Sequence, residues 1–514
     1  MTDGARASPV DVIALHAART PEAPALIEGD RRLSWAEFHG ARNRLSNALT
    51  AMGLRPGERA IVYAANSIEN LLVGAATRSA GAVAVPMNHR LTAEEVRYIL
   101  DDSEASVVFV GDSFVPMAER VRAQAQSVRR WILMGEERRP WAQALVDVLA
   151  AGSTEVPPPT SGGSMVYTAG TTGKPKGALR RAIDPSSVVD RLRELDLADP
   201  SHVHLVAGPL YHSAPGGFAL YAHFLGCPVV VMPHFDPEAA LRTIARFRCT
   251  STFMAPILLK RIVDLPSAVR ARYDVSSMRV IVMAAAPCPM RVKEEVLQVF
   301  GPVLYEFYGS TELGINTVLR PEEVLRKPGS CGRVVSGLDL VILDDAGQPM
   351  PPGQPGELFV KRHPGMFDEY WKKLEATREM RRGDWYSVGD VAYRDDEGFV
   401  YICDRKRDMI ISGGVNIYPA EIEDVLHRHP KIQDVAVFGV PDEEWGERVH
   451  AAVQVRPGQT LSADEVVRFA RERLADYKIP RAVSFEEDFP RDGAGKLVKR
   501  RLREPYWAGR ATRI

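Results

Sequence analysis

The sequence predicts an α/β protein: a large N-terminal domain of parallel-rich sheets with helices on both faces, and a small mobile α+β domain at the C-terminal end. Apolar strand-like runs alternate with helical patterns on both sides of residues 151–163, which is typical of a mostly parallel sheet covered on both faces. The length of 514 residues provides for two or three domain-sized cores. Hydrophobic residues make up 45% and charged residues 25%, as in ordinary soluble globular proteins.

Helix and strand signals follow one another before residue 150. Ser34 precedes a helical run and Glu37 stands three residues later, which is the pattern of a capping box. Residues 59–63 and 106–110 are short apolar runs that we expect to be buried strands. The other expected elements are helices at 10–18 and 68–82, a strand running into a hairpin at 23–30, and a strand at 83–85.

A second α/β series follows the linker-like residues 151–163, which are rich in Pro, Gly, Ser and Thr. Strands are expected at 204–207, 229–232, 280–283 and 303–307, and helices at 237–247 and 290–300. Residues 336–343 and 356–361 have the pattern of an antiparallel hairpin, and they predict a small barrel-like sheet that closes the first domain, residues 1–403.

A charged segment, Asp404-Arg-Lys-Arg-Asp408, marks the next boundary. All five residues carry charge, so the sequence predicts a solvated linker at 404–408. Residues 409–514 are expected to form a compact α+β unit. Its expected helices are 419–427 and 462–474, and its expected strands are 435–440, 449–455 and 483–485.

Charge and composition exclude several classes of protein. Lys and Arg number 65 against 66 Asp and Glu, a balance that argues against nucleic acid as the main partner. Residues 1–19 lack a signal-like apolar block, and the apolar stretch 71–86 is too short to span a bilayer. The five isolated cysteines are typical of reduced thiols rather than of a zinc site. We therefore expect a cytoplasmic protein with at most peripheral membrane contact, as a monomer or homodimer.

The segment Thr168–Gly177, Thr-Ala-Gly-Thr-Thr-Gly-Lys-Pro-Lys-Gly, is here called the Gly/Thr loop, and it follows the strand-like residues 164–167. Its glycines leave the backbone bare for close approach of a ligand. Bare N–H groups, hydroxyls and ammonium groups together suit a nucleotide triphosphate, although the spacing is not that of a Walker loop. From these residues alone, a flexible surface loop is the alternative. The residues that would contact the phosphates are Thr168, Gly170, Thr171, Thr172, Gly173 and Lys176.

The order of residues in the Gly/Thr loop resembles the phosphate loop of the adenylate-forming superfamily, which includes acyl-CoA synthetases, luciferases and carrier-protein adenylation domains. Ala169 departs from the Ser or Gly that is usual there. Further motifs of the family follow in its order between residues 10 and 503. The resemblance, strongest to fatty-acid-CoA ligases, implies an enzyme that uses ATP, Mg²⁺ and coenzyme A to convert a carboxylic acid into its CoA thioester through an acyl-adenylate.

The segment Tyr308-Gly309-Ser-Thr311-Glu312 resembles the family's Tyr-Gly-x-Thr-Glu motif. By that resemblance Tyr308 stacks on adenine, Thr311 hydrogen-bonds the α-phosphate and Glu312 holds the metal. Gly309 belongs to the same nucleotide-binding turn.

Three further residues complete the nucleotide site that the resemblance implies. Ala284 and Ala285 fit the small-residue strand end that passes under adenine, and close packing is the alternative explanation. Asp390 lies at a turn where its carboxylate can accept both ribose hydroxyls, with Arg405 joining it from the linker. Val388 replaces the usual Thr two residues before Asp390, and an ordinary turn aspartate is the alternative.

The C-terminal unit carries two more motifs. Gly413 and Gly414 precede a helix and resemble the loop that lines a tunnel for the pantetheine arm of CoA; a tight turn explains them equally well. Lys496 resembles the family's catalytic lysine, whereas an exposed tail lysine is the default interpretation. The family's pivot falls on Arg407, so rotation about it would withdraw Lys496 and bring in the glycines between the two reaction steps.

The substrate side of the site is expected around His212, in the segment Pro209–Gly217, where the resemblance places it beside the reacting carboxylate. Small residues at 214, 216, 217 and 219 leave room for a large apolar acyl group. No acidic residue lies between Pro209 and Leu220, which argues against an amino acid substrate. The sequence therefore predicts a ligase for a fatty or other bulky hydrophobic acid. The alternatives are a stand-alone adenylation protein that loads a carrier protein, and a non-catalytic nucleotide-binding protein.

Overall fold

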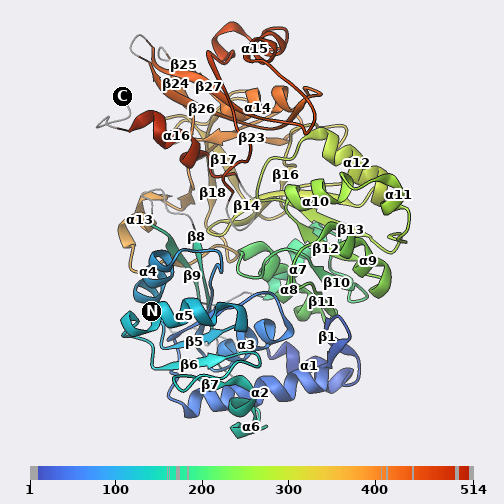
Figure 1. The fold of residues 1–514 in the computed structure, drawn as a ribbon, viewed down its shortest axis with the longest axis vertical. Coiled ribbons are helices and arrows are strands. Elements are labelled where there is room, and N and C mark those ends of the chain that lie inside the picture. Colours follow the sequence, from blue (N-terminus) through green and yellow to red (C-terminus); the bar gives the residue numbers. More distant parts are fainter. Residues whose placement is uncertain are drawn as a thin grey trace.

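The computed structural model describes residues 10–158, 160, 162–168, 174–181, 185–406, 408–412, 415–442, 445–491 and 497–508. Four β-sheets and the helices around them make up these described residues. Figure 1 shows the first elements of the chain in blue at one end of the long axis and the last in red at the other. The α/β class expected from the sequence is confirmed.

The first large sheet has eight strands in the order β19-β9-β8-β4-β3-β5-β6-β7. Strands β4, β3, β5, β6 and β7 run parallel to one another, as the alternation of elements predicted. The strands are β3 (Arg59–Tyr63), β4 (Val83–Pro86), β5 (Val107–Val110), β6 (Arg130–Leu133), β7 (Gln143–Ala144), β8 (Ser164–Thr168), β9 (Lys176–Arg180) and β19 (Glu369–Tyr370). Helices of this region are α3 (Ile68–Ser79), α4 (Ala93–Ser103), α5 (Val115–Val121) and α6 (Leu145–Ala151).

The second large sheet has nine strands in the order β16-β15-β14-β13-β12-β10-β11-β1-β2. Strands β14, β13, β12, β10, β11 and β1 are parallel, so their carboxyl ends meet at one edge. The strands are β1 (Pro24–Glu28), β2 (Arg31–Ser34), β10 (His204–Val206), β11 (Val229–Val231), β12 (Ser251–Met254), β13 (Val280–Met283), β14 (Leu304–Ser310), β15 (Gly314–Leu319) and β16 (Arg333–Val334).

Helices cover both large sheets and fill the space between them. Phe38 of α2, Leu72 of α3 and Ala219 of α8 belong to one buried cluster that also takes side chains from both sheets. The helices around the second sheet are α1 (Val12–Arg19), α2 (Trp35–Ala51), α7 (Pro185–Glu194), α8 (Ser213–Leu225), α9 (Pro237–Phe247), α10 (Pro256–Val263), α11 (Ser267–Arg270) and α12 (Met290–Phe300).

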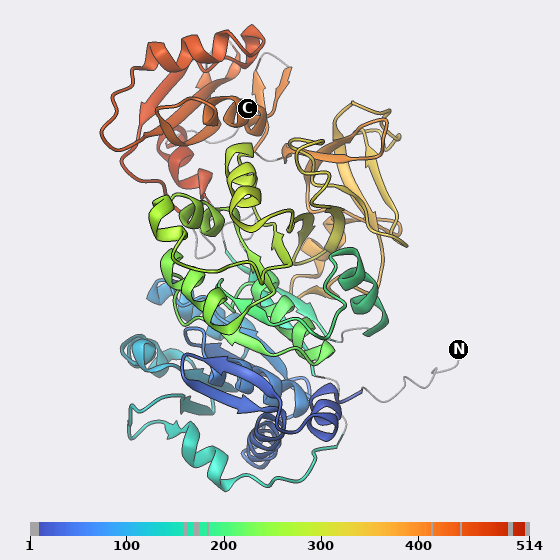
Figure 2. The same cartoon turned by 90° about the vertical axis from the view of Figure 1, so that its right-hand side faces the viewer.

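A smaller sheet of six strands closes the N-terminal part. Leu340 pairs with Val360 in antiparallel β17 and β18, which confirms the hairpin expected there. Its elements are β17 (Leu340–Leu343), β18 (Gly356–Lys361), β20 (Arg381–Arg382), β21 (Trp385–Tyr386), β22 (Asp390–Arg394), β23 (Val400–Arg405) and α13 (Leu374–Glu379). Figure 2 shows this sheet beside the helices of the second large sheet.

The local signals of the sequence explain many of these boundaries. Ser34 and Glu37 form the expected capping box at the start of α2. Strands β3 and β13 and helices α9 and α12 have the predicted bounds. Helix α8 is not among the elements expected from the sequence, and it begins with Ser-Ala-Pro-Gly-Gly. Proline is tolerated in the first helical turn, and a Cβ at Gly216 would come within 2.9 Å of the Leu210 carbonyl oxygen.

The C-terminal unit is a five-stranded sheet in the order β25-β24-β27-β26, with β28 paired to β27. Figure 1 shows it at the red end of the molecule. Its elements are β24 (Ile410–Ser412), β25 (Val415–Ile417), β26 (Ile432–Asp442), β27 (Gly446–Val455), β28 (Ala482–Phe485), α14 (Pro419–His427), α15 (Ala463–Arg471) and α16 (Lys499–Trp507). The α+β character expected for this part of the chain is confirmed.

The linker prediction is wrong at its first residues. Asp404 and Arg405 continue β23, and the Asp404 side chain is 9% exposed. Asp404 Oδ2 accepts from the backbone N–H of Ala420 at the start of α14 and lies 3.9 Å from Lys499 Nζ. The buried charge of Asp404 is tolerated because an opposite charge and a helix N-terminus face it. The run of charged residues in the sequence does not reveal these distant partners.

Lys499 joins the C-terminal helix to this buried acidic group. Its Nζ lies 2.8 Å from Glu423 Oε1 on α14. Burial opposes the charged form of Lys499, but Glu423 and Asp404 outweigh that effect and raise the pKa of the ammonium group. Burial also raises the pKa of the Glu423 carboxyl group.

Replacing Lys499 with Ala is expected to lower the free energy of unfolding by about 3 kcal/mol, because it removes the cation that lies 2.8 Å from the buried carboxylate of Glu423. Urea denaturation followed by circular dichroism measures this loss. Lys431→Ala is the control: its ion pair with Glu465 is one-third exposed, so the loss should stay below about 1 kcal/mol. Equal losses in the two variants would contradict the prediction.

Among the described residues, no helix combines the length and the apolar character needed to cross a bilayer.

Candidate active site

The Gly/Thr loop begins on β8 and ends on β9. These strands are antiparallel, and Thr168 pairs with Lys176 across them. The strand expected before the loop is confirmed, whereas β9 was not expected. The predicted phosphate-contacting residues Gly170, Thr171, Thr172 and Gly173 lie outside the described residues.

Aromatic side chains fix the base of the two strands. The Tyr167 hydroxyl donates to Asp102 Oδ2 at 2.8 Å, and the Trp371 indole N–H donates to the Asp102 carbonyl at 3.0 Å. A Cβ at Gly177 would lie 2.8 Å from the Met165 sulfur, so only glycine fits there without a shift. The ends of the Gly/Thr loop are therefore held by packing on both sides.

Glu312 lies directly against this base. It is 7% exposed, and its Oε1 accepts two hydroxyl hydrogen bonds. Thr168 Oγ1 donates at 3.1 Å and the Tyr370 hydroxyl at 2.7 Å. Lys176 Nζ lies 5.2 Å from the centre of the Tyr370 ring. The structure thus brings together Thr168, Lys176 and Glu312, which are 144 residues apart at the extremes.

The backbone around Glu312 is held from two sides. Arg180 donates to the Thr311 carbonyl at 3.3 Å, and the backbone N–H of Phe367 donates to the Glu312 carbonyl at 2.8 Å. The next carbonyl, of Leu313, lies 3.1 Å from His363 Nε2. Three successive carbonyls therefore have partners from distant segments, which leaves the Glu312 carboxylate little freedom to turn away.

The His363 ring that contacts the Leu313 carbonyl is neutral. Burial, with nearby Arg191 as the next cause, lowers the pKa of His363 to about 3. Its Nδ1 therefore accepts from Arg191 Nη2 at 2.8 Å and from the Gly365 N–H at 3.1 Å, while Nε2–H donates to Leu313.

Tyr308 and Asp390 form a second buried pair. The Tyr308 hydroxyl donates to Asp390 Oδ2 at 2.7 Å, and the two residues are 9% and 6% exposed. Asp390 opens β22 and pairs in register with Arg405 of β23. Asp390 is thus more than an exposed turn aspartate: it is hydrogen-bonded to Tyr308, and its backbone pairs with that of Arg405.

The predicted adenine-side residues lie at the carboxyl ends of β13 and β14. Ala285 has φ +80°, a left-handed conformation that costs a non-glycine residue about 1–3 kcal/mol. Such strain gathers at ligand sites, and its place beyond a parallel strand end is where open α/β sheets bind ligands. Ala284 before it is 5% exposed. Gly309 is needed for packing, since a Cβ would lie 2.1 Å from the Gly314 carbonyl oxygen.

His212 caps the start of α8, next to the same edge. The hydroxyls of Ser213 and Thr311 are 2.9 Å apart, so the first turn of α8 touches the motif that contains Glu312. The His212 ring lies 4.4 Å from the ring of Tyr211.

Two predicted parts of the site remain predictions. Gly413 and Gly414 fall between the paired residues Ser412 and Val415, and Lys496 precedes Leu497, which pairs with Arg491. Gly413, Gly414, Lys496 and the pivot Arg407 all lie outside the described residues.

Sequence reasoning missed Tyr370, Arg180 and His363, which support Glu312. None of them belongs to a recognised motif. Tyr370 is 58 residues from Glu312, and only its place in an aromatic Tyr-Trp pair gives a weak signal in the sequence.

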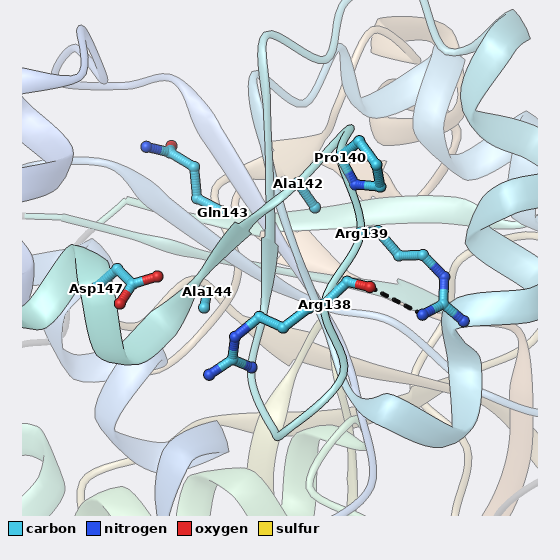
Figure 3. Close-up of a pocket in the computed structure, with 7 residues that line it drawn as sticks. All are labelled: Arg138, Arg139, Pro140, Ala142, Gln143, Ala144 and Asp147. Atoms are coloured by element: carbon cyan, nitrogen blue, oxygen red, sulfur yellow. Dashed lines mark hydrogen bonds between the residues drawn. The ribbon is translucent and has the colours of Figure 1, made fainter.

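A shallow hollow of about 580 Å³ lies away from this site, beside β7 and α6 (Figure 3). Arg138, Arg139 and Asp147 contribute to its lining, and Arg139 donates to the Arg138 carbonyl at 2.9 Å. Its lining includes none of the candidate site residues.

A basic strand pair that faces a buried carboxylate, close to the carboxyl edge of a parallel sheet, is typical of nucleotide-binding α/β enzymes. The chain belongs to a family of this class. Residues 13–371 match the family described as "AMP-binding enzyme", and residues 421–496 match "AMP-binding enzyme C-terminal domain".

Curated relatives and solved structures cover nearly the whole chain. The feruloyl-CoA synthase of Amycolatopsis sp is 36% identical, over 95% of this chain and 96% of its own. The long-chain-fatty-acid–CoA ligase FadD13 of Mycobacterium tuberculosis is 34% identical, over 93% and 94%. The crystal structure of ATP-bound MatB from Rhodopseudomonas palustris superposes with a TM-score of 0.86 at 28% identity, over 97% and 99%.

Proposed function

We propose that the protein is an ATP-dependent acyl-CoA synthetase that converts an apolar carboxylic acid into its CoA thioester and releases AMP and diphosphate. One observation carries the proposal: Glu312 is fixed against Thr168 and Tyr370 at the base of the Gly/Thr loop. Two relatives, FadD13 and feruloyl-CoA synthase, are named for the CoA ligation of a fatty and an aromatic acid. Their similarity to this chain supports the same reaction.

The residues present fit a magnesium ion. Both hydroxyl donors reach Oε1 of Glu312, and among the described residues Oε2 accepts no hydrogen bond. Magnesium prefers oxygen ligands and is usually held by one or two carboxylates together with substrate phosphates. When bound, the ion would offset the charge that develops on the phosphates.

The first step joins the substrate carboxylate to the α-phosphorus of ATP, and diphosphate leaves. Negative charge concentrates in this step, so fixed positive groups and hydrogen-bond donors must already face it. Lys176 and the Thr168 and Thr311 hydroxyls lie on the elements that surround Glu312. In this step the protein orients the reactants and stabilises charge, and it forms no covalent bond with them.

The second step is attack of the CoA thiol on the carbonyl carbon of the acyl-adenylate, with AMP as leaving group. Tyr308 and Asp390 hold the nucleoside in both steps: we infer that the ring of Tyr308 stacks on adenine and that Asp390 accepts the ribose hydroxyls. The hydrogen bond between them supports this role because it fixes the carboxylate before a nucleotide binds.

A diphosphate-release assay over carboxylic acids of graded size, with and without CoA, tests the proposal. The expected result is diphosphate release with at least one apolar acid and AMP turnover that depends on CoA. Diphosphate release without CoA-dependent turnover, but with transfer to a carrier protein, would instead favour the stand-alone adenylation alternative. Absence of any acyl-adenylate with every acid would contradict the proposal.

The Tyr370→Phe variant tests how Glu312 is held. Loss of the hydroxyl removes one of two donors to Oε1, so we expect adenylate formation to fall about tenfold and the half-saturating Mg²⁺ concentration to change. Diphosphate release measured over a Mg²⁺ series separates the two effects. Tyr386→Phe, in the neighbouring small sheet, is the control and should leave both values unchanged. An unchanged Mg²⁺ dependence in Tyr370→Phe would contradict the role.

A further inference from the structure

The start of the acyl pocket is fixed by the contact between α8 and the Glu312 motif. Because the Ser213 and Thr311 hydroxyls are 2.9 Å apart, an acid whose carboxylate reaches the α-phosphate must enter beside the first turn of α8. The face of β12, β13 and β14 that α8 covers is apolar and begins at this contact, so it offers the acyl group a path. Figure 1 shows α8 lying close to β10 and β12.

The upper part of this space is open. A Cβ built on Gly217 meets no atom within 4 Å, so the first turns of α8 leave room beside the backbone. Ala214 on α8 and Ala284 at the end of β13 are small and contribute to the same cluster of side chains. Ala214 and Gly217 are among the small residues expected from the sequence to leave room for the acyl group.

Three phenylalanine rings close the space below. Phe218 of α8 stacks on Phe253 of β12, with ring centroids 5.4 Å apart and planes 10° apart. Phe307 of β14 lies 6.1 Å from Phe218 and 6.2 Å from Phe253. The three side chains are 3%, 4% and 8% exposed. They come from three different elements, so together they form a continuous layer across the path.

The depth of this layer follows from strand register. Phe253 pairs with Val282 of β13, two residues before Ala284, which directly follows that strand. Two strand residues span about 6.6 Å. The open part between Ala284 and the phenylalanine layer is therefore about as deep as one aromatic ring.

Beneath the layer lies a small cavity that Phe218 helps to line. The cavity there has a volume of about 10 Å³ and is lined by residues that include His204, Tyr221 and Ser251. That is room for about one water molecule. His204 also lies 3.1 Å from the Ser251 hydroxyl, so the cavity wall is polar where a methylene chain would pass.

We propose that Phe218, Phe253 and Phe307 form the floor of the acyl pocket and restrict the enzyme to compact apolar acids, the size of one aromatic ring or a short alkyl chain, with long-chain fatty acids excluded. This inference rests on the proposed function. It narrows the range of substrates predicted from the sequence, fatty or bulky hydrophobic acids, to the smaller ones. The reason is that the small residues of α8 line only the upper part of the pocket.

The test is kcat/KM of the full-length enzyme with CoA for benzoate, hexanoate, decanoate and hexadecanoate. The wild-type enzyme is expected to prefer benzoate or hexanoate over hexadecanoate by about 100-fold or more, since added methylenes have no space. Phe218→Ala removes the ring that α8 contributes, and it should raise the decanoate-to-hexanoate ratio about tenfold or more. Phe253→Leu, a milder change within the sheet, should shift the same ratio in the same direction.

Phe300→Ala is the matched control. Phe300 is 7% exposed and packs on the opposite face of the same sheet, so its loss costs packing without opening the pocket. The ratio should stay at the wild-type value. Wild-type activity on hexadecanoate equal to that on benzoate, or an unchanged ratio in folded Phe218→Ala and Phe253→Leu, would overturn the floor alone. No adenylate with any acid would overturn the proposed function together with it.

Discussion

The Glu312→Gln variant is expected to lose about 10²–10³-fold in the rate of adenylate formation. The change removes the negative charge that would hold Mg²⁺ but keeps the size of the side chain. The amide oxygen can still accept from Thr168 and Tyr370, so the local structure should persist. Acid-dependent diphosphate release measures the loss, and a thermal melt shows whether the fold is retained.

Glu294→Gln provides the matched control for this variant. Glu294 is an exposed residue of α12, so the same change of charge and shape occurs away from the site. Its diphosphate release should equal that of the wild-type enzyme. Retention of full activity in Glu312→Gln at limiting Mg²⁺ would show that Glu312 does not bind the ion, and would contradict the assignment.

The sequence predicts the positions of elements well where the signal is local. The capping box of Ser34 and Glu37, and the apolar run of β13, depend on residues within a few positions of each other. Helix α8 lacks such a signal, because proline and two glycines are among its first five residues. Its helical state follows from packing, with Phe218 and Ala219 buried against two different cores. Tertiary contacts here override local preference.

In the candidate site, too, some residues have a local sequence signal and others are placed only by tertiary contacts. The motif residues Tyr308, Thr311 and Glu312 are recognisable because they are contiguous in the chain. Their supports are not: Arg180 reaches Thr311 across 131 residues, and His363 reaches Leu313 across 50. A pattern in one sequence contains no information on such pairs. Substrate size is hidden for the same reason, since the three phenylalanines of the pocket floor meet only in the folded chain.

The Lys496→Ala variant is expected to separate the two half-reactions. We expect adenylate formation to fall about 10²–10³-fold, because the ammonium group would offset charge on the phosphates during the first step. Thioester formation from preformed acyl-adenylate should stay near the wild-type rate, because diphosphate has already left. Single-turnover measurements of each half-reaction give the two rates independently. Arg500→Ala, which removes an exposed cation of α16 paired with Glu504, is the control and should leave both rates unchanged.

This separation follows from a geometric conflict. One ammonium group close to the phosphates helps the first step, whereas the thiol of CoA needs access to the same acyl carbon in the second. The contacts of Lys499 with Glu423 and Asp404 tie α16 to the end of β23, so a rotation at Arg407 would have to break the contact between Lys499 and Asp404. Because Lys496 precedes α16 by only a few residues, it would move with the C-terminal unit rather than with the nucleotide site. Equal loss of both half-reactions in Lys496→Ala would mean that the lysine serves a step common to both, and the proposed alternation between lysine and thiol access would then fail.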